Sequence, residues 1–379
     1  MDQIGLSPAE IREWLFGQAL PLWARSGRLE NGAFHERIDR LSQPIPKPAL
    51  RMRTQARQIY VFASAVRHDW SGHDMALPAF QFVRDHYWHA DGGWIFSVDN
   101  AGNPVDQRRD MYEQAFALLM LAALKQIEIA EDVDYWIDAS LEFLDQALAD
   151  NTHGGYRQGV PDLLPRGQNP HMHMLEAALA LYDVRRRPED LARAERLVAL
   201  FSKHLFDREN AMLGEYFEND WRPASGGDGD IVEPGHQFEW VWLLHRYARA
   251  AGDDAVLTMA RALYSKSVRF GIDLEDGLVF DRIMRSGQVS DDSKRLWPQA
   301  EALKAHLAMS ELGAPLDPAQ RALRGLFDHY LDLRDGLWRE HLYRDRRDQV
   351  DFVPATSLYH LFVALTEYLR VVEGSAAGR

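Results

Sequence analysis

The residues best suited to chemistry in this sequence are histidines at the heads of long apolar segments. His236 lies in PGHQFEWVWLLHRYARA, His360 in TSLYHLFVALTEYLRVV and His173 in NPHMHMLEAALALYDV. Imidazole exchanges protons near neutral pH, so histidines around one substrate can act as acid and base. A lone histidine in an apolar helix is more often a core residue. Their shared place in a repeated pattern favours chemistry.

Six segments follow this pattern at nearly constant spacing. One residue near the head of each is separated from the next by 55, 61, 63, 61 and 63 positions: Arg57, Tyr112, His173, His236, Trp297 and His360. Beyond the polar head, each segment is apolar on almost every face, which is typical of a buried helix. We therefore expect six buried helices with polar N-terminal ends.

A glycine followed closely by an aromatic residue precedes each buried segment. These glycines are 61, 62, 59, 63 and 59 residues apart: Gly32, Gly93, Gly155, Gly214, Gly277 and Gly336. They indicate turns that lead into short extended segments or β-hairpins. More amphipathic segments, such as 7–27 and 132–150, lie before these turns. The repeating unit is therefore an outer helix, a glycine turn and an inner helix, about sixty residues in all.

Six such units with buried inner helices favour a closed, all-α, two-layer toroid. An open solenoid is the alternative, but it needs polar capping repeats, and the first and last units are no more polar than the others. We expect residues 1–379 to form one domain.

In a toroid the inner helices run in the same direction, so their polar heads meet at one face. The polar residues expected there are Arg53, Arg57, Tyr112, Asn169, His171, His173, His236, Glu239, Trp297, Gln299, Glu301, Thr356 and His360. Burying so many polar groups costs free energy unless a site needs them. Structural roles stay open for some: Arg57 as an ion-pair partner of Glu239 or Glu301, Trp297 as core, and Glu176 as a hydrogen-bond partner of His173.

Composition narrows the function further. The formal net charge is −14, which disfavours nucleic acid as a partner, and the absence of cysteine excludes thiolate chemistry. The sequence has no apolar run long enough for a membrane span, no secretory leader, no dinucleotide fingerprint and no P-loop. We expect a cytoplasmic protein without a cofactor, acting as a monomer or homodimer.

A metal site is also not expected. His171 and His173 form a His-x-His pair, but on a helix side chains two positions apart point roughly 200° away from each other. Paired carboxylates among Asp110, Glu176, Glu239 and Glu301 leave a glycoside hydrolase open. A sugar-binding toroid without catalysis is a third alternative. Histidines suit better the proton transfers of aldose–ketose isomerisation or of epimerisation at C2, and neither reaction needs a redox cofactor.

Five stretches of this sequence resemble the N-acylglucosamine 2-epimerase family. They lie between residues 51 and 365 and read RMRTQARQIYVFA, QNPHMHMLEAALALYD, EPGHQFEWVWLL, RLWPQAEALKA and ATSLYHLFVAL. The resemblance implies an (α/α)6 barrel in which His236 and His360 are the acid–base pair and His173 is a third site histidine. It also implies that Arg57 contacts the sugar and stabilises an enediolate.

The same resemblance places further residues around the sugar, namely Tyr112, Asn169, Glu239, Trp297 and Gln299, and we expect Glu301 beside them. The wording of the motifs is closest to the mannose isomerases. We therefore expect interconversion of D-mannose and D-fructose, or of D-lyxose and D-xylulose, through a cis-enediol. In this hypothesis His360 moves the C2 proton, and His236 assists ring opening, oriented by Glu239 one helical turn on.

Other enzymes of the family remain alternatives. They are a 2-epimerase of the N-acylglucosamine or cellobiose type and a mannose 6-phosphate isomerase. For a phosphorylated sugar, the basic residues expected near the mouth are Arg51, Arg53 and Arg166.

Overall fold

The inner layer consists of six helices that are apolar on nearly all faces. The computed structural model describes residues 6–331 and 334–377. The inner helices within these ranges are α3 (Met52–Ala65), α5 (Met111–Gln126), α7 (Gln168–Arg185), α9 (Pro234–Ala251), α11 (Leu296–Glu311) and α13 (Thr356–Ala377). In α5, every residue from Glu113 to Leu124 is buried, as expected of a helix enclosed on all sides.

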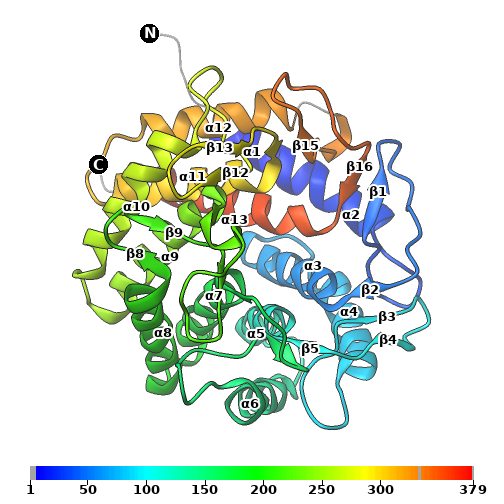
Figure 1. Cartoon of the computed structure of the whole chain (residues 1–379). Coiled ribbons are helices and arrows are strands. Elements are labelled where there is room, and N and C mark those ends of the chain that lie inside the picture. Colours follow the sequence, from blue (N-terminus) through cyan, green and yellow to red (C-terminus); the bar gives the residue numbers. More distant parts are fainter. Residues whose placement is uncertain (1–5, 332–333, 378–379) are drawn as a thin grey trace.

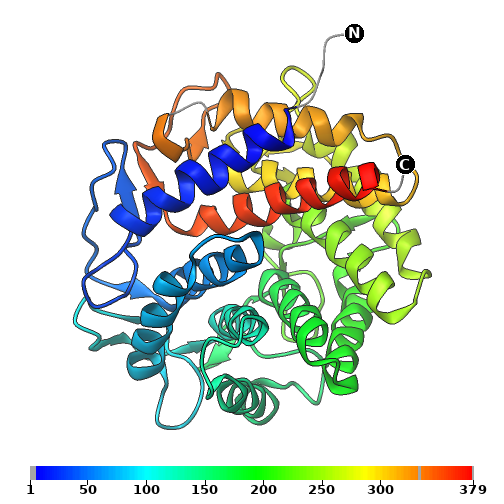
Figure 2. The same ribbon diagram turned by 180° about the vertical axis from the view of Figure 1, so that it is seen from behind.

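The outer helices are amphipathic and cover this layer. They are α1 (Pro8–Arg12) continuing through a π-helical segment into α2 (Leu20–Ser26), then α4 (His73–Tyr87), α6 (Val133–Phe143), α8 (Pro188–Leu200), α10 (Val256–Gly271) and α12 (Asp317–His329). Ser7 and Glu10 form a capping box at the start of α1, as the sequence indicates. Figure 1 shows the helices in two concentric rings, and Figure 2 shows the same arrangement from behind. The predicted (α/α)6 barrel is confirmed.

The barrel is closed, because the first and last repeats join. Gln58 Nε2 on α3 donates a hydrogen bond to the carbonyl of Ala355, just before α13, at 2.7 Å. On the outside, Arg12 and Glu373 form an ion pair at 2.9 Å. The open solenoid considered from the sequence is therefore excluded.

Short antiparallel strands join each repeat to the next. The ladders are β2 (Leu50–Arg51) with β3 (Ser97–Val98), β5 (Arg109–Asp110) with β6 (Gly159–Val160), β7 (Arg166–Gly167) with β10 (Tyr216–Phe217), β11 (Ile231–Val232) with β12 (Arg282–Met284), β14 (Lys294–Arg295) with β15 (His341–Leu342), and β16 (Phe352–Pro354) with β1 (Arg37–Asp39). Because the last ladder returns to the first repeat, these small separate sheets together form a closed belt at the heads of the inner helices.

Hairpins also form within repeats, as the glycine turns predict. Strand β3 pairs with β4 (Pro104–Asp106), β12 with β13 (Val289–Asp291), and β8 (Phe206–Asp207) with β9 (Met212–Leu213). The pairing between repeats was not predicted, since two-residue strands carry no alternating pattern that a sequence can reveal.

The fourth residue of five inner helices clamps the glycine turn of its own repeat. Gln114 bonds both the N–H and the carbonyl of Trp94 at 2.8 Å, and Gln55 does the same for Phe34. Gln237 and His171 accept single backbone N–H groups from Leu213 and Tyr156. These bonds pair buried backbone groups that would otherwise be unsatisfied.

Gln299 is the fifth clamp, which corrects its predicted role in sugar binding. Its amide bonds the N–H and carbonyl of Val279 at 2.7 and 3.0 Å, and the carbonyl of Arg295 at 3.0 Å. Both ends of the amide are therefore occupied by backbone.

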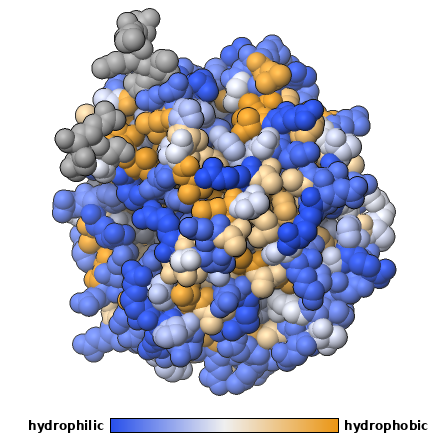
Figure 3. Space-filling model, turned by 90° about the vertical axis from the view of Figure 1, so that its left-hand side faces the viewer, coloured by the Kyte–Doolittle hydropathy of each residue, from blue (hydrophilic) through white to orange (hydrophobic). Residues whose placement is uncertain are grey.

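Figure 3 shows hydrophilic side chains over most of the face on the left of Figure 1, where α10 lies, with an apolar area near the middle of that face. No helix among the described residues is long and apolar enough to cross a membrane.

The clamp predicts a stability effect for Gln114→Met. Two buried backbone groups of Trp94 would lose their partners, at about 1–3 kcal/mol each. We expect the free energy of unfolding, measured by denaturant titration with circular dichroism, to fall by about 2–4 kcal/mol. Gln126→Met, at the exposed end of the same helix, is the control and should change it by less than about 0.5 kcal/mol. Equal losses would contradict the clamp.

Candidate active site

The polar heads of the inner helices surround one cavity of about 370 Å³. This volume suits a small ligand. Predicted site residues that line it are Arg57, Tyr112, Asn169, His173, His236, Glu239, Trp297 and His360. Arg53, Asp110, Gln158, Gly167, Pro170, Glu215, Tyr216, Glu233 and Arg295 complete the wall. Of the residues expected at this face, His171, Gln299, Glu301 and Thr356 do not line the cavity.

His236 is held by a carboxylate from a loop. Its Nδ1 lies 2.8 Å from Glu215 Oε2 and 3.7 Å from Glu233. Glu215 is itself fixed, because it accepts bonds from Gln168 Nε2 at 3.0 Å and from the N–H of Glu233 at 3.1 Å. Burial alone would lower the pKa of His236, but Glu215, Glu233 and Glu239 outweigh it and raise this pKa to about 9. His236 therefore carries a proton at neutral pH.

The prediction that Glu239 orients His236 is wrong. Glu215 takes that position, and it lies in the glycine turn Gly214–Tyr216 rather than on α9. An acidic residue inside one of the six glycine–aromatic turns was the only sequence signal for it.

His360 has the opposite character. Its Nδ1 lies 2.7 Å from Glu301 Oε1. Burial, Arg57 and Lys304 hold the pKa of His360 well below its usual range, so the ring is neutral. Glu301 thus lies behind His360 and outside the cavity wall, whereas the sequence analysis expects it beside the sugar. The ring of Trp297 packs against both imidazoles, with centroids 4.8 Å from His236 and 5.8 Å from His360.

His173 lies deeper in the site. Its Nδ1 is 3.2 Å from Glu176 and 3.8 Å from Glu239, and its ring packs on Phe116 and Tyr112. Burial lowers the pKa of His173, so its ring is neutral. The contact with Glu176 matches the structural role considered from the sequence. His171, by contrast, belongs to the clamps and lies outside the cavity wall.

Arg57 offers positive charge to the cavity. Its Nη2 donates to the hydroxyl of Tyr112 at 2.8 Å, and its guanidinium lies 4.2 Å from the centroid of Phe116. Among the described residues, it forms no ion pair with Glu239, Glu301 or another carboxylate, contrary to the structural alternative. A guanidinium that is not engaged by a carboxylate can bind sugar oxygens or a developing oxyanion.

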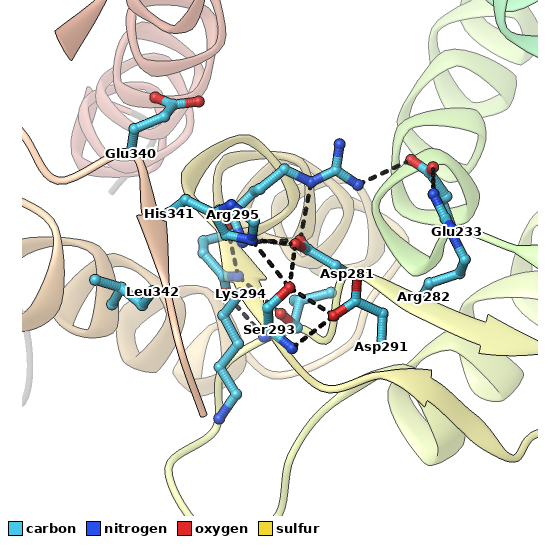
Figure 4. A network of polar contacts seen from close by, with 12 residues as sticks. Glu233, Asp281, Arg282, Asp291, Ser293, Lys294, Arg295, Glu340, His341 and Leu342 are labelled. Atoms are coloured by element: carbon cyan, nitrogen blue, oxygen red, sulfur yellow. Dashed lines mark hydrogen bonds and ion pairs between the residues drawn. The ribbon is translucent and has the colours of Figure 1, made fainter. Parts of the chain in front are cut away.

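Two further arginines lie at the cavity wall. Arg53 is paired with the buried Glu113 at 2.5 Å. Arg295, on β14, lies between Asp281 at 3.1 Å and Glu233 at 3.3 Å (Figure 4). Of the basic residues expected at the mouth, only Arg53 lines the cavity. Arg166 is buried against Asp150, and Arg51 pairs with Glu36. The sequence analysis missed Arg295.

Three acidic or imidazole side chains come close enough to be considered for a metal ion. Ligand atoms of His173, Glu176 and Glu239 lie within 4.8 Å of one another. Lys304 Nζ lies 3.8 Å from Glu239 and already supplies a positive charge beside this cluster. The ammonium of Lys304 therefore offsets the negative charge of this cluster, and we assign no metal to it.

This site lies on a chain that matches the family model of N-acylglucosamine 2-epimerase over residues 32–364. The chain belongs to that family. A mannose-6-phosphate isomerase of Rhizobium meliloti is 35% identical, over 96% of this chain and 97% of its own length. A D-mannose isomerase of Marinomonas mediterranea is 26% identical over 66% of this chain and 68% of its own length. The protein is thus a sugar isomerase or epimerase of this family.

Solved structures agree on the fold. A cellobiose 2-epimerase of Spirochaeta thermophila superposes with a TM-score of 0.88 at 25% identity, covering 97% of both chains. A D-mannose isomerase superposes at 0.87 with 22% identity, covering 96% of this chain and 98% of its own. A family 76 α-mannanase of Bacteroides thetaiotaomicron reaches 0.71 at 12% identity, over 97% of this chain and 100% of its own, and shares the fold alone.

The environment of His236 predicts the effect of Glu215→Gln. Removing the nearest negative charge should lower the pKa of His236 from about 9 by about one unit or more. The measurement is an NMR titration of the imidazole C–H signals, assigned by comparison with His236→Asn. Glu209→Gln, in the exposed turn between β8 and β9, is the control. A pKa that stays near 9 in Glu215→Gln would show that other groups hold the proton on His236.

Proposed function

We propose that this enzyme is an aldose–ketose isomerase for sugars of the mannose configuration, with mannose 6-phosphate and fructose 6-phosphate as its preferred pair. The observation that carries the reaction type is the opposite protonation of two histidines on one cavity. His236 is an acid with a pKa of about 9, and His360 is neutral. One group able to donate a proton and one able to accept it are what enolisation needs.

The steps follow from these charges. His236 donates its proton to the ring oxygen as the C1–O5 bond breaks, and then takes the proton of the O1 hydroxyl, which gives the open-chain aldehyde. Neutral His360 then removes the proton from C2. Arg57 stabilises the negative charge that develops on the oxygens of the resulting cis-enediol. For isomerisation, His360 returns the proton to C1 on the same face while the proton of the O2 hydroxyl passes to O1, so that C2 becomes the carbonyl. Ring closure then gives the ketose.

The choice of the phosphorylated sugar rests on the relatives and on the cavity wall. The relative that is 35% identical over nearly the whole chain is named for mannose 6-phosphate, whereas the D-mannose isomerase from Marinomonas is 26% identical over a shorter stretch. Arg53 and Arg295 place guanidinium groups where a phosphate on C6 could reach them. The sequence analysis expects free D-mannose as the substrate, whereas we propose mannose 6-phosphate, which was one of its alternatives.

Parallel assays of the two sugars test the substrate. We expect kcat/KM for mannose 6-phosphate to exceed that for D-mannose by about tenfold or more, since one additional charged contact contributes about 1.5–3 kcal/mol. Proton NMR in D2O identifies the product. Fructose 6-phosphate supports an isomerase, and glucose 6-phosphate labelled at C2 without a ketose would show an epimerase instead. A higher kcat/KM for free D-mannose would contradict the phosphorylated substrate and support the D-mannose isomerase expected from the sequence.

The roles of the histidines predict a mutant effect and a pH profile. His360→Ala should lower kcat by about 10²–10⁴. Because His236 must hold its proton, kcat/KM of the wild type should fall as the pH rises above about 9. His73→Ala, at the exposed start of α4, is the control and should keep full activity. Turnover in His360→Ala within about tenfold of wild type would rule out His360 as the base.

A further inference from the structure

Lys304 is a fully buried cation beneath the two active-site histidines. It lies on α11, one helical turn after Glu301, and its Nζ is 2.6 Å from Glu301 Oε2 and 3.8 Å from Glu239 Oε1. The ammonium also lies 3.9 Å from the ring centroid of Trp242. None of the three charged side chains is exposed. A buried ammonium is costly, and replacing such ion pairs by apolar residues often stabilises a protein. A buried charge that costs stability therefore suggests that Lys304 has a functional role.

All six inner helices contribute ionisable groups to this region. They are Arg57 and Tyr60 on α3, Tyr112 on α5, His173 and Glu176 on α7, His236, Glu239 and Arg246 on α9, Glu301 on α11, and Tyr359 and His360 on α13. On α5, Glu113 is paired with Arg53 at the mouth. Lys304 lowers the pKa of all three carboxyl groups, Glu176, Glu239 and Glu301, and the protonated His236 also acts on Glu301. His173 and His360 are neutral.

The protonation of Glu301 decides what His360 can do. Its Oε1 faces His360 Nδ1 at 2.7 Å. An ionised Glu301 accepts the N–H of Nδ1, which leaves the lone pair of Nε2 free to take a proton. A protonated Glu301 donates to Nδ1 instead, so the neutral ring carries its hydrogen on Nε2 and has no base to offer.

We propose that Lys304 is a positioning residue that keeps Glu301 ionised and thereby holds His360 in the tautomer with hydrogen on Nδ1. The proposal rests on the proposed function for the role of His360 as base. It assigns to Lys304 a part in the reaction although the cavity wall does not include it.

The balance of charges is close enough for one cation to matter. Burial raises the pKa of Glu301 to about 7, against the opposing effect of Lys304. Burial and Glu301 also raise the pKa of Glu239 to about 7. Without the ammonium both carboxyl groups would bind protons at still higher pH. The pH at which kcat/KM falls on the acid side should therefore equal the pKa of Glu301, and Lys304 should determine that pKa.

The test is the pH dependence of kcat/KM in Lys304→Met, a substitution of similar length without charge. We expect the acid limb to move upward from about pH 7 by about one unit or more, since an adjacent opposite charge shifts a carboxyl by about 1–3 units. Activity should be lost most at pH 6 to 7 and recover best toward the upper limb set by His236. Lys304→Arg, which keeps the charge, should restore the wild-type limb.

A purely structural role gives a different result. It would lower kcat/KM by the same factor at every pH, and the limb would stay in place, which would overturn the proposal. Lys203→Met, an exposed lysine, is the charge-matched control. Glu239→Gln removes the second carboxyl with a pKa near 7, and the shift caused by Lys304→Met should persist in that background. The same double variant balances the charge if Lys304→Met alone does not fold.

A measurement without substrate separates this proposal from the proposed function. Nitrogen NMR of histidine-labelled protein, with His360 assigned by comparison with His360→Asn, reports which ring nitrogen carries the hydrogen. At pH 7.5 we expect Nδ1–H in the wild type and a change toward Nε2–H in Lys304→Met. An unchanged tautomer would overturn the role of Lys304 and leave the isomerase proposal standing. Full turnover in His360→Ala would instead contradict the isomerase mechanism.

Discussion

The requirement that all inner helices of a closed ring run in the same direction governs this structure. It brings six N-terminal ends to one cavity, where their unpaired N–H groups and dipoles favour negative charge. It also forces the turns before these helices together, and the belt of two-residue ladders satisfies their backbone. The glutamine clamps complete that task from within. The heads of the helices are thus fixed twice, by strands outside and by side chains inside, before any substrate binds.

This rigid frame explains how two histidines with the same kind of partner acquire different charges, one positive and one neutral. Each places Nδ1 against a glutamate, Glu215 for His236 and Glu301 for His360. Near His236, Glu215, Glu233 and Glu239 accumulate negative charge, so the imidazolium is stabilised. Near His360, burial acts together with Arg57 and Lys304 against a second positive charge. The nearest hydrogen-bond partner therefore does not determine the protonation state of each histidine. The sum of the surrounding charges and the burial of the ring determine it.

The repeat of about sixty residues predicted the two helical layers, the closure of the ring and the gathering of polar heads at one face. It did so because periodic hydrophobicity and glycine turns are local features. The errors concern the side chains behind that face. Gln299 belongs to the clamp series because it is the fourth residue of its helix, like Gln55 and Gln114, and this period was visible in the sequence. Glu215 and Arg295 come from turns and strands that reach the cavity only after the ring closes, so no local pattern reveals them.

In the proposed mechanism, the groups that transfer protons lie on the inner helices, whereas one of the two arginines proposed to bind the phosphate, Arg295, lies on a strand of the belt. The proton-transfer groups lie on the inner helices and are locked by buried charges, so a change there disturbs several pKa values at once. Arg295 lies on a belt strand, and its carboxylate partners Asp281 and Glu233 come from neighbouring turns (Figure 4). Turns tolerate substitution far better than a buried helix does. A barrel of this kind therefore allows residues at the mouth to change while the buried floor stays the same.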